Sequence, residues 1–337
     1  MNYLALDIGG ANVKIADGQG YAASYQFALW REPARLAREL RMILSQAPPS
    51  VHLAVAMTGE LADCFVTKAE GVKFILEAVG AASDQRHTRV YLSDGRMVTP
   101  QVAQAFPYLA AASNWHALAQ FSTRFASEGT SLLIDIGSTT TDLIPIIGGK
   151  VTTLGTTDTT RLLNDELVYM GVERTPVCGI VSSVPYRGKK CPVALEHFAT
   201  TYDAFLLLDQ LPESATDTRT ADGRPATKKH ARIRMGRMVA ADEQDFNHRD
   251  AVFIAETVAE AELQRIALAA KRIFARLDHP PDTYILSGGG EFLGTKVLEE
   301  LPAAKRVVKL SAELGPLVSK CAPAHALAVL AREAHGV

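Results

Sequence analysis

The fold of this chain is decided by Leu132-Leu-Ile-Asp-Ile-Gly-Ser-Thr-Thr-Thr-Asp-Leu-Ile-Pro-Ile146. Two apolar runs flank a short polar stretch that begins at Gly137, which predicts a buried strand, a tight turn and a second strand. The glycine lets the backbone approach a ligand closely, and the hydroxyls of Ser138 to Thr141 can donate hydrogen bonds to phosphate oxygens. The stretch therefore predicts a phosphate-binding hairpin.

A similar unit opens the chain, as Tyr3-Leu-Ala-Leu-Asp-Ile-Gly-Gly-Ala-Asn-Val-Lys-Ile-Ala16. Both copies run from an apolar strand through Asp-Ile-Gly and a small polar turn into a second apolar strand. They lie much further apart than the repeats of a solenoid, so the duplication is one of whole domains.

The predicted elements after each hairpin follow the same order, which indicates two α/β domains with a mixed sheet in each and a ligand cleft between them. We expect a first domain over residues 1–126, with a last helix over 316–335 packing back on it. The second domain covers residues 127–315. It carries an insertion over residues 173–248, which lacks periodicity and which we expect to close over the cleft.

The composition is that of a soluble globular protein. The formal net charge of −2 argues against a nucleic-acid partner. Four well-separated cysteines indicate reduced thiols and a cytoplasmic location. No secretory signal is expected because a strand is predicted directly after Met1, and the lack of a long apolar run predicts no membrane span. A homodimer is left open.

A broad resemblance follows from the two turns together with the later motif Leu286-Ser-Gly-Gly-Gly-Glu-Phe292. These residues resemble the sugar kinase, Hsp70 and actin superfamily. The resemblance implies two ribonuclease-H-like domains that hold a phosphorylated ligand between the hairpin turns, with the glycine-rich turn at adenosine in members that bind it. The second turn is similar to the hydantoinase A/oxoprolinase branch.

A narrower resemblance covers nearly the whole chain. The chain is similar to the tetrahydromethanopterin-linked one-carbon pathway family, which includes the methanofuran-biosynthesis enzyme. That enzyme joins an (aminomethyl)furanylmethyl diphosphate to the phenol oxygen of γ-glutamyltyramine, and the product of a bacterial relative would be methylofuran. The resemblance rests on Ala5-Leu-Asp-Ile-Gly-Gly-Ala-Asn-Val-Lys14, Met57-Thr-Gly-Glu-Leu-Ala62, Ala112-Ser-Asn-Trp115, Asp135-Ile-Gly-Ser-Thr-Thr-Thr-Asp142, Asp165-Glu-Leu-Val-Tyr-Met-Gly171, Thr175-Pro-Val-Cys178 and Thr220-Ala-Asp-Gly-Arg-Pro225.

The resemblance implies an alkyl or aryl transferase that releases diphosphate, and this chemistry assigns roles to several residues. We expect Asp7 and Asp135 to hold Mg²⁺ through water. Lys14 is expected to contact the diphosphate. A phenol has a pKa near 10, so a carboxylate, Asp142 or Glu60, is expected to activate it.

The remaining candidates form two groups. The phosphate-binding group, which also includes Lys14, is Gly9, Gly10, Asn12, Gly137, Ser138, Thr139 and Thr140. The substrate- or nucleotide-binding group is Asn114, Trp115, Asp203, Gly288, Gly289, Gly290 and Glu291, in which Asp203 would meet the cationic aminomethyl group.

Each candidate has a purely structural alternative. Asp7 and Asp135 could cap amides in their turns, Glu60 could begin a helix, and Gly288–Gly290 could form a plain strand-to-helix turn. Two competing functions also remain: an ATP-dependent kinase or oxoprolinase-type amidohydrolase, and a nucleotide-regulated binding module. Use of ATP is left open.

Overall fold

The N-terminal hairpin is the centre of the first sheet in the computed structural model, which describes residues 2–334. In sheet order the strands are β3 (Ala22–Gln26), β2 (Asn12–Ala16), β1 (Tyr3–Ile8), β4 (His52–Met57), β5 (His87–Tyr91) and β6 (Met97–Val98). β1 pairs antiparallel with β2 and parallel with β4, so the sheet is mixed.

The second sheet repeats this arrangement around the second hairpin. In sheet order its strands are β10 (Leu167–Val168), β8 (Thr141–Ile147), β7 (Thr130–Ile136), β13 (Thr283–Ser287) and β14 (Arg306–Lys309), and β9 (Lys150–Val151) also pairs with β8. β7 is antiparallel to β8 and parallel to β13. The predicted duplicated α/β fold is confirmed.

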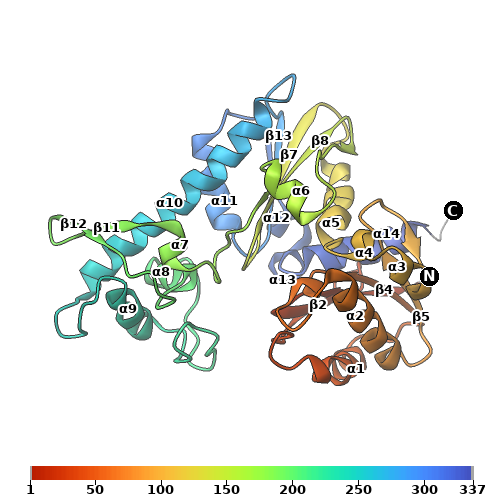
Figure 1. Ribbon diagram of the computed structural model, residues 1–337. Helices are drawn as coiled ribbons and strands as arrows, with labels where there is room; N and C mark the ends of the chain where they lie inside the picture. Colours follow the sequence, from red (N-terminus) through yellow and green to blue (C-terminus); the bar gives the residue numbers. More distant parts are fainter. Residues whose placement is uncertain (1, 335–337) are drawn as a thin grey trace.

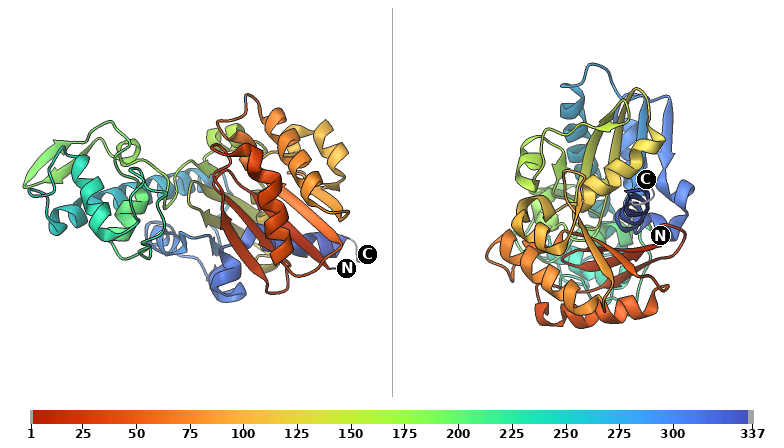
Figure 2. Two further views of the ribbon diagram at one scale, coloured as in Figure 1. Left: turned by 90° about the horizontal axis from the view of Figure 1, so that it is seen from below. Right: turned by 90° about the vertical axis from the view of Figure 1, so that its right-hand side faces the viewer.

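Alternation along β1 separates two packing layers, because successive side chains of a strand point to opposite faces. Leu4, Leu6 and Ile8 pack in the core formed with α1 (Leu36–Gln46) and α2 (Lys68–Ala82). Tyr3 and Ala5 face the other way, toward α14 (Ala322–Ala334). Figure 2 shows the C-terminal helix on the side of the sheet opposite to α1.

Two helices fill the space between the sheets. α5 (Asn114–Ser122) packs Trp115 and Leu118 against Leu133 and Ile144 of the second sheet, and α14 packs in the same cluster. The far face of the second sheet is covered by α10 (His248–Phe274) and α11 (Glu291–Val297). The other described α-helices outside the insertion are α3 (Pro100–Ala105), α4 (Pro107–Ala110), α6 (Asp158–Leu163), α12 (Leu310–Leu314) and α13 (Pro316–Ser319).

The insertion extends away from the two sheets and has its own core, built against the first half of α10 (Figure 1). Its elements are α7 (Val177–Ile180), β11 (Ser183–Tyr186), β12 (Lys189–Pro192), α8 (Thr201–Leu207) and α9 (Lys228–Arg237). Among the described residues, no helix has the length and apolar character needed to span a membrane.

Candidate functional site

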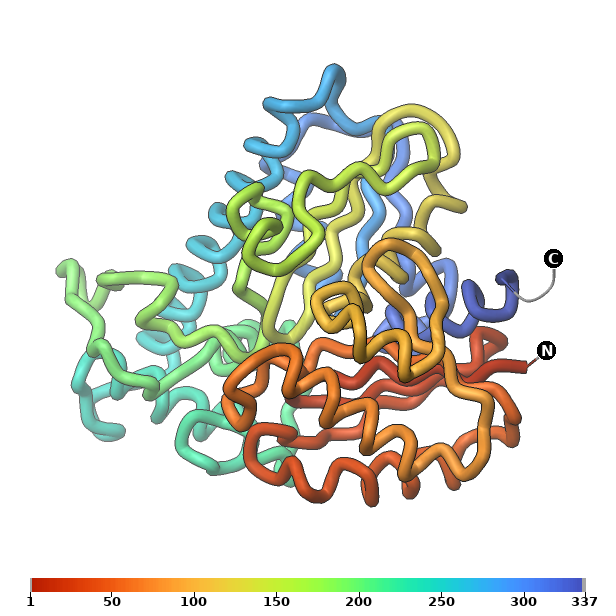
Figure 3. Tube along the Cα trace, turned by 45° about the vertical axis from the view of Figure 1, so that its right-hand side comes forward, coloured from red at the N-terminus to blue at the C-terminus, as the bar shows by residue number. Residues whose placement is uncertain are grey.

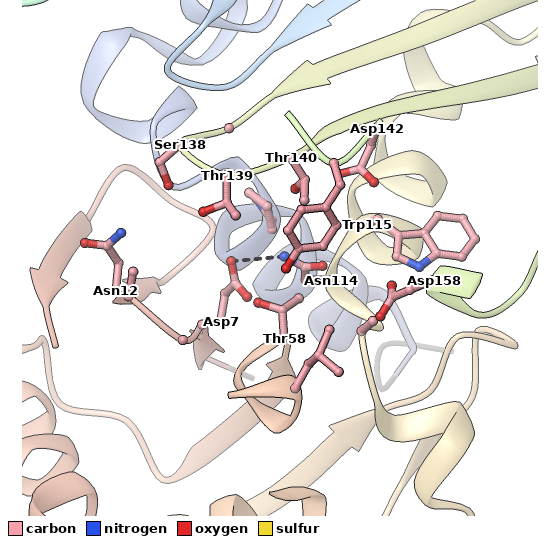
Figure 4. Close-up of a pocket in the computed structure, with 18 of the residues that line it drawn as sticks. Asp7, Asn12, Thr58, Asn114, Trp115, Ser138, Thr139, Thr140, Asp142 and Asp158 are labelled. Atoms are coloured by element: carbon pink, nitrogen blue, oxygen red, sulfur yellow. Dashed lines mark hydrogen bonds between the residues drawn. The ribbon is translucent and has the colours of Figure 1, made fainter. Parts of the chain in front are cut away.

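The two hairpin turns face one another across a cavity of about 280 Å³. Figure 4 shows the hydroxyl side chains of the second turn directed toward Asp7 of the first domain. The predicted site residues that line this cavity are Asp7, Gly9, Gly10, Asn12, Lys14, Asn114, Trp115, Asp135, Gly137, Ser138, Thr139, Thr140 and Asp142. The structure therefore brings together residues from both duplicated units.

The two turns close with the same backbone hydrogen bond. The N–H of Gly9 donates to the carbonyl oxygen of Asn12 at 2.9 Å, and the N–H of Gly137 donates to that of Thr140 at 2.8 Å. A Cβ atom on Gly9 would lie 3.0 Å from the Asn12 oxygen, so a larger residue would strain the turn. The duplication seen in the sequence is thus a duplication of backbone geometry.

Two aspartates lie at the strand ends that lead into these turns. One carboxylate oxygen of Asp7, Oδ1, is buried without a hydrogen-bond partner in the described structure, while Oδ2 accepts from Asn114 Nδ2 at 3.4 Å. Burial raises the pKa of Asp7, against the effect of Lys14. Burial also raises the pKa of Asp135 to about 6, and the Asp142 carboxylate adds to the rise. A cation bound between these carboxylates would offset the free-energy cost of burying their negative charge.

The carboxylates of Asp7 and Asp135 suit a Mg²⁺ ion that is bound together with a phosphate group. Across residues 2–334, no three or more His, Cys, Asp or Glu side chains gather in a way that could hold a metal. Mg²⁺ usually takes only one or two protein carboxylates and completes its shell with water and phosphate oxygens. Asp7, with its unpartnered oxygen, and Asp135 match that requirement.

The opposite end of the cavity is built around Asp142. Its Oδ1 lies 2.9 Å from Nη1 of Arg161, whose guanidinium lies over the Trp115 ring with Cζ 4.0 Å from the centroid. Burial raises the pKa of Asp142, and Arg161 opposes that rise. Near this end, Asp158 of the second domain pairs with Lys68 of the first at 2.6 Å. The pairing joins the two domains beside the cavity.

Glu60 does not line the cavity, and its role in activating the phenol stays a prediction. It lies in the short 3-10 helix Gly59–Leu61 and is 1% exposed. Both of its carboxylate oxygens lack a hydrogen-bond partner in the described part of the chain, and burial raises its pKa to about 8. The backbone of this turn packs tightly against α2, where a Cβ on Gly71 would lie 2.5 Å from the Glu60 carbonyl oxygen.

Asp203 lies apart from the other predicted site residues, and its contact with the aminomethyl group stays a prediction. Asp203 lies in α8, away from the cavity lining, and is 1% exposed. Its carboxylate pairs with Arg234 at 2.6 Å and accepts the Thr200 N–H at 3.0 Å. Arg234 also pairs with Asp222 at 3.0 Å. These contacts hold the Thr220–Pro225 motif against α9, which gives Asp203 a structural role.

The glycine-rich turn packs closely against the end of β7, and its contact with substrate or nucleotide stays a prediction. Gly288 has φ +90°, and a Cβ there would lie 2.2 Å from the Ile136 carbonyl oxygen. A Cβ on Gly290 would lie 2.4 Å from the Ile136 side chain. The Glu291 carboxylate accepts the Ser311 N–H at 3.2 Å at the start of α12. None of these residues, nor Gly289, lines the cavity.

Comparison with known proteins agrees with this architecture. Residues 52–334 match the hydantoinase/oxoprolinase family. The chain belongs to that family. It is also 32% identical over 333 residues to the (4-{4-[2-(gamma-L-glutamylamino)ethyl]phenoxymethyl}furan-2-yl)methanamine synthase of Methanocaldococcus jannaschii, covering 97% of this chain and 96% of that protein. The narrower family resemblance seen in the motifs is confirmed.

Two further proteins are similar to this chain, one in sequence and one in fold. A synthase of the same name from Methanococcus vannielii is 29% identical over 201 residues, which cover 59% of this chain and 89% of that protein. The nucleotide-free structure of an ATP-dependent acetone carboxylase matches 97% of this chain and 70% of its own with a TM-score of 0.54 at 10% identity. The latter likeness concerns the fold alone.

Several cavity residues escaped the sequence reasoning. Trp30, Asp158, Arg161, Tyr169 and Arg174 all line the cavity, and none of them lies in either turn motif. Tyr169 lies within the motif Asp165–Gly171, which was a signal of its importance. The other four carry no local pattern that separates them from ordinary surface residues.

Proposed function

We propose that this protein is a synthase that couples an (aminomethyl)furanylmethyl diphosphate to the phenol oxygen of γ-glutamyltyramine, or of a related tyramine, and releases diphosphate. The observation that carries the proposal is the 32% identity over 97% of the chain to a synthase whose printed product is such an aryl ether. This chain's own residues support the same reaction, because the two hairpin turns and Lys14 line one cavity that suits a diphosphate group.

The reaction forms one carbon–oxygen bond, breaks another, and transfers the phenol proton to a base. The phenol oxygen attacks the furanylmethyl carbon, the bond from that carbon to the diphosphate oxygen breaks, and its electron pair stays on the diphosphate. The furan ring oxygen stabilises the positive charge that develops on the carbon. The protein's task is to stabilise the departing anion, and well-placed donors in a water-poor site contribute several kcal/mol to such a step, on the order of 3 each.

Lys14 is the residue best suited to bind the diphosphate from the first domain. It lies opposite Asp7 in the β1–β2 register, lines the cavity, and has no ion pair among the described residues. The small turn residues Gly9, Gly10 and Gly137 give a phosphate close access to the backbone. Mg²⁺ held by Asp7 and Asp135 would neutralise charge on the leaving group when it is bound.

Asp142 is suited to accept the proton of the phenol. It lines the cavity, burial strengthens it as a base, and Arg161 keeps its carboxylate oriented. The ion pair with Arg161 also fixes the position of the Asp142 carboxylate. A phenol that donates its proton to that carboxylate would therefore be held in one orientation.

The test is a coupling reaction with Mg²⁺, γ-glutamyltyramine and the furan diphosphate in the absence of ATP. We expect the ether and diphosphate in equal amounts. Asp7→Asn should lower turnover by about 100-fold or more, while the exposed Asp278→Asn should leave it unchanged. Release of ADP from added ATP, with no ether unless ATP is present, would refute the proposal in favour of an ATP-dependent enzyme.

A further inference from the structure

The first residues of the insertion are attached to the second phosphate turn. The backbone N–H groups of Glu173 and Arg174 both donate to the carbonyl oxygen of Ser138, at 3.1 and 2.9 Å. The position of Arg174 is therefore fixed by the turn that faces the cavity. Its own side chain then lines that cavity.

The side chain of Arg174 reaches across to the first domain. Its guanidinium lies over the ring of Trp30, with Cζ 4.6 Å from the ring centroid, and Trp30 lines the same cavity. Stacking on an aromatic ring uses the flat face of a guanidinium and leaves the N–H groups around its edge to bind an anion. Trp30 thus holds the arginine side chain without occupying its donors.

Arg174 has no acidic partner in the described structure. Three cationic side chains line the cavity there: Lys14, Arg161 and Arg174. Arg161 is engaged by Asp142 at 2.9 Å. Within residues 2–334, no carboxylate lies within ion-pair distance of Lys14 or Arg174, and no protein group accepts a hydrogen bond from the Arg174 side chain. The cavity therefore offers two uncommitted positive charges, one from each domain.

A neighbouring contact brings the insertion onto the first phosphate turn. Arg219 donates from Nη1 to Asn12 Oδ1 at 3.4 Å and is oriented by Asp217 through an ion pair of 2.7 Å. Figure 3 shows this part of the insertion beside the N-terminal domain. The segment that carries Arg174 and the segment that carries Arg219 thus both lie at the phosphate-binding side of the cavity.

We propose that Arg174 binds the diphosphate group of the substrate from the second-domain side, across from Lys14, and stabilises the charge that builds on it as the carbon–oxygen bond breaks. This inference rests on the proposed function, because it takes a diphosphate as the ligand. A planar fork of N–H donors matches the oxygen atoms of a phosphoryl group in a way that a lysine cannot.

The test measures binding of inorganic diphosphate to the full-length protein by calorimetry in the presence of Mg²⁺. Arg174→Ala should weaken the affinity by about 10- to 100-fold, the range for losing hydrogen bonds to a charged group. Arg174→Lys should recover only part of that loss. Arg249→Ala is the matched control, because Arg249 is an exposed arginine near the insertion and outside the cavity lining, and its affinity should equal that of the wild type.

Two results would overturn the inference: unchanged affinity in Arg174→Ala, or an equal loss in Arg249→Ala. Unfolding midpoints measured on the same samples establish that each variant is folded, which is expected because Arg174 is exposed. Failure of the proposed function is separable. A wild-type protein that binds diphosphate and makes no ether would refute the coupling reaction alone, whereas equal binding by Arg174→Ala and wild type would refute only the role of Arg174.

Discussion

Replacing Arg161 by methionine should destabilise the protein through the carboxylate it leaves behind. Arg161 is 1% exposed. Its Nη1 pairs with Asp142 at 2.9 Å, its Nη2 donates to the Glu166 carbonyl oxygen at 2.9 Å, and its face covers Trp115. Methionine keeps much of the apolar bulk and removes the charge. Asp142 would then be a buried carboxylate with no cation beside it.

The expected size of the effect follows from the burial of the pair. Breaking a buried ion pair by removing one partner costs about 3–5 kcal/mol. The Asp142 side chain keeps 14% exposure, so water compensates in part and we expect about 3 kcal/mol for Arg161→Met. Asp142→Asn should cost about 2 kcal/mol, because Arg161 keeps its other two contacts. With a coupling of about 2 kcal/mol, the double variant should lose only about 3 kcal/mol.

The assay is urea unfolding at pH 7 of the wild type, the two single variants and the double variant. A second cycle pairs Asp142→Asn with Arg86→Met as the control, because Arg86 donates to backbone carbonyls in the first domain and pairs with no carboxylate in the described part of the chain. That control cycle should be additive. If the Arg161–Asp142 cycle is additive as well, the ion pair does not stabilise the fold and the reasoning is refuted.

Three further predictions follow from single features. Burial raises the pKa of Glu262 from 4.5 to about 8, so the contribution of this residue to stability is greatest below pH 4.5 and falls as the pH rises toward 8. Glu262→Gln should therefore stabilise the protein at pH 8 by up to about 5 kcal/mol, seen as a higher unfolding temperature, and a gain equally large at pH 4.5 would contradict this. Gly288→Ala should cost about 3 kcal/mol or more, because the new Cβ meets a backbone oxygen at positive φ, whereas Gly289→Ala, which has open space, should change the urea midpoint little. Lys68→Met removes the 2.6 Å pair with Asp158 and should cost about 1 kcal/mol at low salt; a loss that persists in 1 M NaCl would point to packing instead.

The sequence determined the two hairpins and therefore the centre of each sheet. Short apolar runs set the strands, and the glycine after each Asp-Ile pair set the turns. These are local properties, so the geometry of Gly9 and Gly137 could be predicted without knowing the rest of the chain. The same motifs supplied nearly half of the cavity lining, because residues next to such a turn stay next to it in the fold.

Only the tertiary structure decided which other side chains reach the cavity. Glu60 was a candidate to activate the phenol and Asp203 a candidate to meet the aminomethyl group, yet one is buried against α2 and the other pairs with Arg234. Arg161 and Arg174 looked like ordinary arginines, yet both stack on tryptophans in the cavity lining. A carboxylate or guanidinium takes its role from the charge, ring or solvent beside it. Those neighbours come from distant parts of the chain, so they are settled only when the two domains and the insertion pack together.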